Sequence, residues 1–294
     1  MGIGATINES GRRPGLGWLP DHPDIRDLTV EDGDVESLLA KTSVPGLDPP
    51  SLPASVDLRA WCSPIENQGN LGACTAHAGV GMVEYLERRA HGTYIDASRR
   101  FLYKVTRKLA GFTGDSGAFL RNTIGGMRLF GVPPESYWPY IEAQFDEEPP
   151  AFCYAFGQNF QALTYYRLDP PGMDRKALLA SIKEHNASQL PSMFGFTAYP
   201  TIFSAPDGKI PLPRKGEKPA GGHAVMTVGY DDAIEISNHE STSKGAFRIR
   251  NSWGTSWGEK GYGWLPYDYV LGNLAVDWWV LLTEEWVNTG EFAT

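Results

Sequence analysis

The sequence predicts an α+β protein in which a mainly helical lobe is followed by a mainly antiparallel β lobe. Between residues 52 and 160, apolar residues recur at the spacing of amphipathic helices, and after residue 161 short runs rich in β-branched and aromatic residues predominate. With 294 residues, the chain is long enough for two lobes that share one cleft. We expect the functional site in that cleft.

Residues 1–51 predict an extended N-terminal arm in front of the two lobes. The segment is rich in Gly, Pro and Asp, as residues 14–27 illustrate, and it lacks sustained periodicity. Its one helical pattern is formed by Val35, Leu38 and Leu39. Because so short a helix is unstable alone, it needs the body of the protein to hold it.

The helical lobe is assigned to residues 52–160. Its helix patterns are each followed by a glycine that can end the helix, and they cover residues 76–89, 98–109 and 119–130.

The β lobe is assigned to residues 161–294 and opens with a helix pattern at 175–185. The stretch 231–244 is expected to be a long connection with His239 on a solvated loop. Strand patterns precede and follow it, at 193–197, 223–230, 246–251 and 276–282.

The charge balance argues against nucleic acid as a partner. The formal net charge is −9 at pH 7, whereas a surface built to bind phosphates carries clustered Lys and Arg. No apolar run approaches the roughly 18 residues of a membrane helix, and the first residues lack the apolar core of a signal peptide. We therefore expect a cytoplasmic monomer without a membrane partner, and secretion by another route stays open.

Histidines and cysteines do not predict a metal centre. The six His and three Cys show no paired ligand spacing, so we expect neither a metal nor another cofactor. Four of the histidines are interpreted as surface residues, namely His22, His91, His185 and His239.

Cys74 is the strongest candidate for a nucleophile. It follows a Gly-containing loop at 68–73 and lies at the start of an apolar helix pattern. Unpaired backbone N–H groups and the helix dipole stabilise a thiolate at such a position. The alternative is a small buried core residue, which is the commoner role of an isolated Cys.

Two later segments decide between these readings. One contains His223 in the run Gly-Gly-His-Ala-Val, and the other begins at Asn251 with Asn-Ser-Trp-Gly-Thr-Ser-Trp-Gly. Together with Gln68, six residues before the cysteine, these segments resemble the motifs of the papain-like cysteine peptidases. Residues 52–59 and Trp138-Pro-Tyr140 also resemble this family, so the resemblance covers most of the chain from residue 52 onward.

The resemblance implies a fold and a lineage as well. The fold would be papain-like, with a helical left lobe, a right lobe resembling an antiparallel β-barrel, and the active site in the cleft between them. Within the family, a short non-helical arm and few cysteines are typical of bacterial members.

The resemblance also implies roles for four residues. Cys74 would be the nucleophile and His223 its base and acid. Asn251 would orient the imidazole, and Gln68 would donate to the oxyanion beside the backbone N–H of the cysteine. A thiolate–imidazolium pair would then hydrolyse peptide bonds through an acyl-enzyme, as in a cysteine-type endopeptidase acting on proteins or peptides. Two alternatives stay open: a papain-like acyl transferase or ligase, and an inactive papain-like binding module.

Several positions depart from the family pattern. Leu71 stands where many relatives have a disulfide cysteine, and the loop 113–117 lacks the matching cysteine. Thr75 replaces the Trp that usually follows the nucleophile, so that wall of the cleft is smaller. His77 lies on the same helix as the nucleophile and is interpreted as a core residue.

Cys62 and Cys153 either pair with each other or both stay reduced. Because no export signal is visible, we expect reduced thiols.

Candidate substrate-binding residues also follow from the resemblance. Ser116 and Gly117 would lie on the loop whose backbone pairs with an extended substrate. Ala224 and the apolar run 276–282 favour an apolar pocket for the second residue upstream of the scissile bond, although both could be ordinary core. Trp253 would shield the hydrogen bond between Asn251 and the catalytic histidine from water.

The arm is the expected inhibitor of the protein's own active site. Residues 15–20 contain the large apolar side chains of Trp18 and Leu19, with glycines that allow close backbone approach. Pro20 and Pro23 remove backbone donors and would hinder cleavage. The alternative is an arm without contact to the site.

Overall fold

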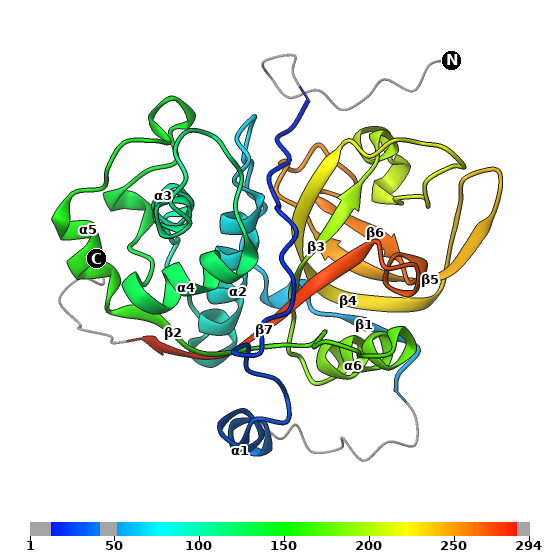
Figure 1. The fold of residues 1–294 in the computed structure, drawn as a ribbon, viewed down its shortest axis with the longest axis horizontal. Helices are drawn as coiled ribbons and strands as arrows, with labels where there is room; N and C mark the ends of the chain where they lie inside the picture. Colours follow the sequence, from blue (N-terminus) through cyan, green and yellow to red (C-terminus); the bar gives the residue numbers. More distant parts are fainter. Residues whose placement is uncertain (1–12, 42–51, 287–294) are drawn as a thin grey trace.

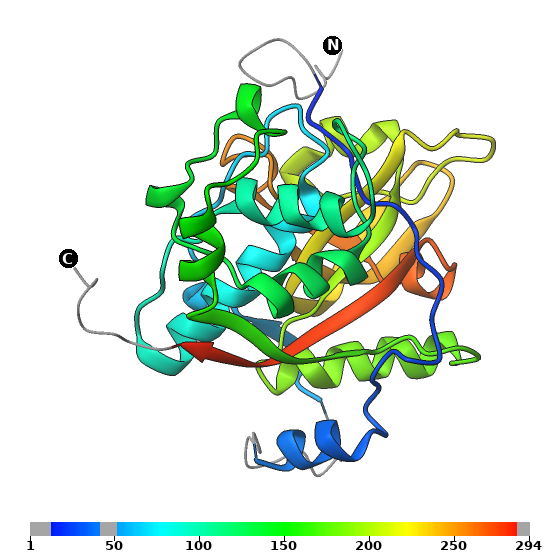
Figure 2. The same ribbon diagram turned by 60° about the vertical axis from the view of Figure 1, so that its left-hand side comes forward.

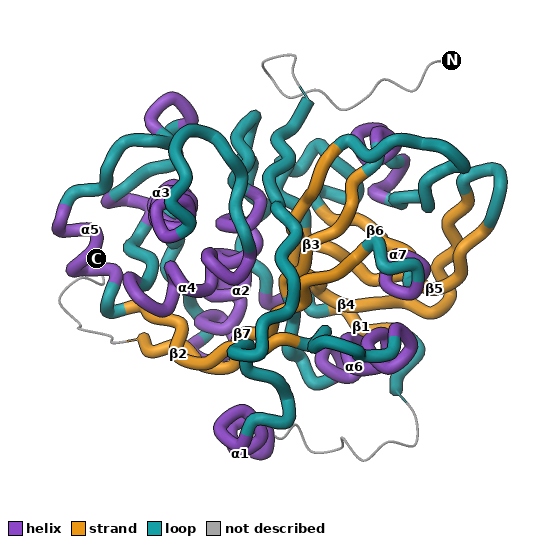
Figure 3. The backbone as a smooth tube through the Cα atoms, in the orientation of Figure 1, coloured by secondary structure: helices purple, strands orange, loops and turns teal. Residues whose placement is uncertain are grey.

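The computed structural model of the chain describes residues 13–41 and 52–286. Four helices gather on one side of the molecule, and most of the strands lie on the other (Figure 1, Figure 3). This two-lobe arrangement of helices and an antiparallel sheet confirms the predicted α+β fold class. The four helices are α2 (Cys74–His91), α3 (Arg99–Leu109), α4 (Leu120–Phe130) and α5 (Ala151–Gly157).

Local signals explain where the helices of this lobe begin and end. Helix α2 ends at Gly92, whose φ of 75° is a left-handed conformation that costs glycine little. Ser98 caps α3, because its hydroxyl accepts the backbone N–H of Phe101. Helix α2 starts at Cys74, before the predicted start at residue 76, so the cysteine lies in its first turn.

The other lobe is built on one antiparallel sheet of seven strands. The strand order is β2-β7-β3-β4-β5-β6, and β1 pairs with β4 outside this path. One end of the sheet extends beneath the helical lobe, where β2 packs against α4 and α5 (Figure 2). The strands are β1 (Ser55–Asp57), β2 (Phe160–Arg167), β3 (Met193–Ala198), β4 (Gly221–Ser237), β5 (Thr242–Arg250), β6 (Tyr262–Pro266) and β7 (Ala275–Trp286).

The sheet differs from the prediction in extent. The alternation of apolar and polar residues in the sequence does not predict β1, β2 or β6. The stretch 231–244 is not a long connection, because it extends β4 and β5 into a hairpin joined at 238–241. His239 lies exposed in that turn, as expected. His185 is half-buried and hydrogen-bonded to the Tyr166 hydroxyl at 2.7 Å, so its assignment to the surface is wrong.

Further helices connect these elements. Helix α6 (Arg175–Ala187) begins after Asp174, whose carboxylate accepts the N–H groups of Lys176 and Ala177, and it packs on β4. The rest are α7 (Asp268–Leu271) and 3₁₀ turns at Arg59–Trp61, Glu135–Tyr137, Glu142–Gln144, Pro200–Ser204 and Pro206–Gly208.

Two hydrophobic clusters fill the lobes, and the central strands contribute to both. On β4, Ala224 and Met226 belong to the cluster around α2, whereas Val225 belongs to the cluster inside the sheet lobe. On β7, Trp279 faces the first cluster and Trp278 the second. Because successive residues of a strand point to opposite faces, the sheet is buried on both sides.

A buried charged network ties the lobes together. Glu84 of α2 is fully buried, pairs with Arg99 of α3 at 2.9 Å, and accepts a hydrogen bond from the Ser63 hydroxyl. Arg250, at the end of β5, donates to the same hydroxyl at 2.7 Å and to the Pro64 carbonyl at 2.7 Å. The strand that precedes Asn251 is therefore fixed to the helical lobe.

The arm passes between the two lobes in an extended path and ends in α1 (Gly33–Lys41) at the edge of the molecule (Figure 1, Figure 2). Val35 of this helix is fully buried in the cluster of the sheet lobe, with Leu28 packed beside it. The short helix thus packs on the body of the protein, as its length requires.

All three cysteines are free thiols, as expected. The Cys62 sulfur lies 3.8 Å from the Leu58 carbonyl oxygen, and the Cys153 sulfur lies 4.0 Å from that of Tyr137. Both side chains are buried in the cluster around α2.

We expect three free thiols per chain when the protein is denatured without reductant and titrated with a thiol reagent. The reason is that Cys62 and Cys153 contact backbone oxygens and apolar groups rather than each other. A titre of one thiol would instead show a bridge between them.

Candidate active site

Cys74 is the first residue of α2 and points its sulfur at backbone donors. The N-cap residue, Ala73, offers no side-chain cap, so the N–H groups of the first turn remain available. The Cys74 sulfur accepts a hydrogen bond from the Ala224 N–H at 3.4 Å, and the nearby N–H groups of Cys74 and Thr75 act to lower the pKa of the thiol. The helix start and β4 thus meet at the thiol.

His223, the residue before Ala224 on β4, is fully buried and held by Asn251. Its Nε2 lies 2.8 Å from the Asn251 Oδ1, a hydrogen bond in which the ring nitrogen donates. Within the described part of the chain, Nδ1 has no hydrogen-bond partner. The histidine therefore has one nitrogen fixed by the amide and the other free to take the thiol proton.

Trp253 covers this pair. Its ring stacks on the His223 ring at 4.7 Å between centroids, with an interplanar angle of 29°, and on Phe203 at 5.4 Å. Only 3% of Trp253 is exposed. The tryptophan thus shields the hydrogen bond between His223 and Asn251 from solvent.

Gln68 is fixed by the segment that follows Asn251. Its Oε1 accepts the Ser252 hydroxyl at 2.5 Å, and its backbone N–H donates to the Ser252 carbonyl at 2.8 Å. The Nε2 donors point to two carbonyls, that of Leu71 at 2.7 Å and that of Gly15 at 3.1 Å. Gly15 belongs to the arm.

The arm makes strand-like contacts along both walls of the cleft. On the helical side, the Gly15 N–H donates to the Gly69 carbonyl, and Ala118 pairs in parallel with the arm through the Gly17 carbonyl (2.8 Å) and the Leu19 N–H (3.0 Å). On the sheet side, the Trp18 N–H donates to the Gly222 carbonyl at 3.1 Å. The Gly17 N–H lies near the Cys74 sulfur and acts to lower the pKa of its thiol.

Glycine is required where the arm approaches the walls most closely. A Cβ on Gly17 would lie 2.0 Å from the Gly72 carbonyl oxygen. On the facing loop, a Cβ on Gly117 would lie 2.3 Å from the Gly17 carbonyl oxygen, and the φ of Gly117 is 74°. Larger side chains at either position would push the arm out of the cleft.

Trp18 fills a pocket that reaches into the sheet lobe. Its ring lies against Gly195 of β3, where any Cβ would overlap it, and only 5% of the residue is exposed. The indole N–H donates to Oδ2 of Asp277 on β7 at 2.9 Å. The sequence analysis did not single out Asp277, because it is the one charged residue in the otherwise apolar run 276–282.

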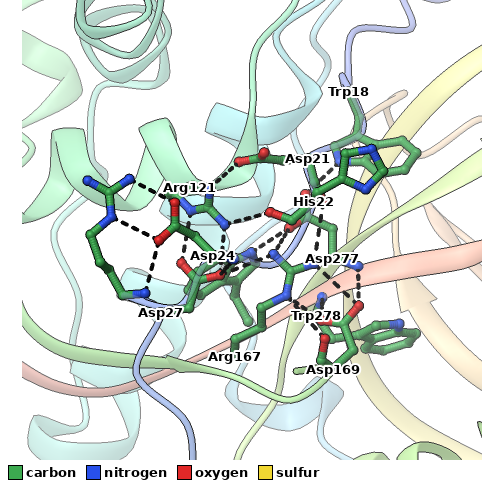
Figure 4. A network of polar contacts seen from close by, with 12 residues as sticks. Trp18, Asp21, His22, Asp24, Asp27, Arg121, Arg167, Asp169, Asp277 and Trp278 are labelled. Atoms are coloured by element: carbon green, nitrogen blue, oxygen red, sulfur yellow. Dashed lines mark hydrogen bonds and ion pairs between the residues drawn. The ribbon is translucent and has the colours of Figure 1, made fainter. Parts of the chain in front are cut away.

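Two arginines hold the arm beyond this pocket (Figure 4). Arg121 of α4 pairs with Asp21 at 2.9 Å and with Asp27 at 2.7 Å, and donates to the His22 carbonyl at 2.9 Å. Arg167 of β2 is buried and lies 3.6 Å from Asp27. These acidic arm residues had no assigned role in the sequence.

Cys74 and His223 are both fully buried. Burial raises the pKa of the Cys74 thiol to about 11, partly offset by the backbone N–H donors. Burial also lowers the pKa of His223 to about 4, against the opposing effect of Asn251. With the arm in place, both groups are neutral between these values. The ion pair needed for catalysis is thus disfavoured while the cleft is covered.

The predicted site residues come together with one shift in position. Asn251 holds His223, the residue after His223 donates its N–H to the Cys74 sulfur, and Gln68 is bonded to the residue after Asn251. The backbone pairing with the arm falls on Ala118, directly after the predicted Ser116 and Gly117, and Ser116 makes no hydrogen bond to the described arm residues. His77 is buried beside Tyr140 and bonds to the Ala73 carbonyl, as a core residue would.

The described residues form neither a metal-binding cluster nor a membrane-spanning helix. Among them, no group of three or more His, Cys, Asp or Glu side chains could hold a metal ion. In the same part of the chain, every helix is too short or too polar to cross a membrane.

Comparisons with known proteins identify relatives over nearly the whole chain. A model of the papain family of cysteine proteases matches residues 52–270. An uncharacterized peptidase C1-like protein, L477 of Acanthamoeba polyphaga mimivirus, is 30% identical over 281 residues, which are 90% of this chain and 86% of the relative.

Solved structures agree with this result. Xylellain, a cysteine protease from Xylella fastidiosa, is 34% identical with a TM-score of 0.72, covering 92% of this chain and 98% of its own. The Amb a 11 cysteine protease of ragweed pollen, in its proform, is 20% identical with a TM-score of 0.56, covering 81% and 69% of the two chains. At that identity, Amb a 11 shows a shared fold alone.

We expect His223 to remain a neutral imidazole in the full chain at about pH 6, below the ordinary histidine pKa of about 6.5. The reason is that burial lowers its pKa to about 4. Side-chain ¹⁵N NMR measures this directly, with the His223 signals assigned by their loss in His223→Gln. An imidazolium signal from His223 in the full chain at about pH 6 would contradict the neutral pair.

Proposed function

The chain belongs to the papain family of cysteine proteases, and we propose that it is an endopeptidase whose own N-terminal arm occupies and inhibits the active site. The observation that carries this proposal is the contact of the arm with both the nucleophile and the oxyanion donor. The Gly17 N–H reaches the Cys74 sulfur, and the Gly15 carbonyl accepts a hydrogen bond from Gln68 Nε2.

The geometry supports acyl transfer in two stages once the arm has moved. His223 takes the thiol proton through Nδ1, the Cys74 sulfur attacks the peptide carbonyl, and the imidazolium returns the proton to the leaving amine. Water then hydrolyses the thioester with His223 as base. Gln68 Nε2 and the backbone N–H of Cys74 donate to the oxyanion in both stages.

The arm can occupy this site without being cut, because it presents the wrong group to the thiol. An amide N–H of Gly17 faces the sulfur, whereas attack needs a carbonyl carbon there. The Gly17 carbonyl is turned away and bonds to the Ala118 N–H. The cleft is thus filled by a peptide in a non-productive pose.

Asn251→Ala should lower turnover while leaving the fold intact. Because Asn251 orients His223 but transfers no proton, we expect a loss of about 10- to 10,000-fold, smaller than that of Cys74→Ala. The measurement is kcat with a peptide substrate, analysed with and without a competing amine to separate hydrolysis from transfer. Asn159→Ala, a change after α5 in the helical lobe, is the control. Unchanged turnover in Asn251→Ala would refute the role.

Arg121→Gln should weaken the arm's hold on the cleft. The change removes the pairs with Asp21 and Asp27, and each partly exposed pair contributes up to about 1 kcal/mol. We therefore expect Cys74 in the full chain to react with iodoacetamide about 5-fold faster, with a parallel rise in peptide turnover. Mass spectrometry identifies the labelled residue.

Two comparisons make this test specific. Arg128→Gln removes a charge from the same helix at an exposed position and should leave the rate unchanged. A chain that starts at Leu52 sets the upper limit for an uncovered cleft. Equal alkylation rates in that shortened, folded chain and in the full chain would end the proposal of self-inhibition.

A further inference from the structure

The pocket that holds Trp18 has one polar end in an otherwise apolar and glycine-lined space. That end is Asp277, which is fully buried and has a φ of 62° at an irregularity in the pairing of β7 with β3. The neighbouring Asp169 carboxylate accepts the N–H groups of Asp277 at 2.8 Å and of Trp278 at 2.9 Å. The backbone irregularity is thus satisfied and holds the Asp277 side chain in place (Figure 4).

The two oxygens of this carboxylate have different partners. Oδ1 accepts the Trp279 indole N–H at 2.8 Å and lies 3.1 Å from the Arg167 guanidinium. Oδ2 accepts the Trp18 indole N–H, and no other hydrogen bond to it occurs among the described residues. When the arm leaves the cleft, Oδ2 therefore loses its donor and faces the vacated pocket.

A substrate must use the same channel as the arm. Gly222 and Ala118, the backbone partners of the arm, lie on opposite walls of the cleft. Gly17, the arm residue before Trp18, lies beside the Cys74 sulfur. Any extended peptide that brings a carbonyl to the thiol passes between these walls. One of the residues beside its scissile bond then lies at the mouth of the pocket.

We propose that Asp277 is a specificity-determining residue, and that the vacated pocket selects a tryptophan side chain of the substrate through a hydrogen bond from the indole N–H to Oδ2. This rests on the proposed peptidase function. It replaces the expected apolar preference, because an apolar side chain of the same size would bury Oδ2 without a donor.

The local charges favour a neutral donor over a cation. When Asp21 and Asp27 leave with the arm, Arg167 stays paired with Asp169 at 2.9 Å and with Asp277 at 3.1 Å, and Arg121 stays within the field of Asp277. Two positive and two negative groups then balance. A substrate arginine would bring a third positive charge into this buried end without a counter-ion.

The test compares two peptides that differ only in whether one aromatic side chain carries an indole N–H. One carries tryptophan and the other 3-benzothienylalanine, in which sulfur replaces the indole N–H, placed in turn at each of the three residues before the scissile bond. The enzyme is the full chain with Trp18→Ala, which vacates the pocket. Because an arm that partly blocks the cleft lowers both kcat/KM values by one factor, their ratio is unaffected.

At one of the three positions, we expect the tryptophan peptide to be preferred about 10-fold or more, as for a hydrogen bond to a charged buried acceptor. The matching arginine peptide should be cleaved more slowly than the tryptophan peptide. A ratio near one at all three positions, or a preference for arginine, overturns the assignment.

Asp277→Asn provides a shape-conserving variant. Its amide oxygen must face the donors Trp279 and Arg167, so its NH₂ group faces the substrate indole and the ratio should fall to about one or below. Asp207→Asn is the matched control, because it removes a carboxylate charge at an exposed turn outside the pocket and should keep the preference. If the Asp277 variant fails to fold, the ratio in the Trp18→Ala enzyme still decides.

Binding provides a second measurement that separates the two hypotheses. The same peptides should protect Cys74 from iodoacetamide with the same order of preference. If the tryptophan and 3-benzothienylalanine peptides are cleaved, or protect Cys74, equally well, the role of Asp277 is wrong and the peptidase function is unaffected. If no peptide is cleaved and none protects Cys74, both proposals fail.

Discussion

The packing of α2 against β4 is the constraint on which the active site depends. Cys74 begins the helix and His223 lies on the strand, so neither lobe contains a working site alone. Ala224 and Met226 pack into the cluster around α2, and the buried network of Glu84, Ser63 and Arg250 fixes the end of β5 to the helical lobe. Asn251 follows Arg250 directly, so the same network positions the group that orients the histidine.

Under the proposed function, the arm links occlusion of the cleft to the ionisation of Cys74 and His223. Cys74 and His223 are fully buried in the cleft that the arm occupies, and this burial raises the pKa of the thiol and lowers that of the imidazole. Under the proposed function, the arm opposes catalysis twice, by excluding the substrate and by favouring the uncharged form of the pair. The backbone N–H of Gly17 replaces only part of the lost solvation of the sulfur.

Sequence patterns predicted the elements that are amphipathic and the residues that lie in motifs. Helices α2, α3, α4 and α6 have clear periodicity, and the site quartet stands in short recognisable segments. The strands β1 and β6 are too short for periodicity to show, and the hairpin of β4 and β5 is masked by its polar, solvent-facing residues. Asp277 could not be predicted for another reason. Its proposed role depends on contacts with Trp18 and Arg167, which lie 259 and 110 positions away in the chain.

Under the proposed functions, some groups of the cleft bind both the arm and the substrate, whereas others bind the arm alone. Gly222, Ala118 and Asp277 bind the arm within the channel that a substrate must also use, so a change to any of them alters both affinities together. Arg121 contacts Asp21 and Asp27 outside that channel. Because the arm is tethered, its effective concentration is high, and a few such contacts are enough to set how often the cleft opens. Under the proposed function, the strength of self-inhibition can therefore change at Arg121 without a change in the groups that line the channel.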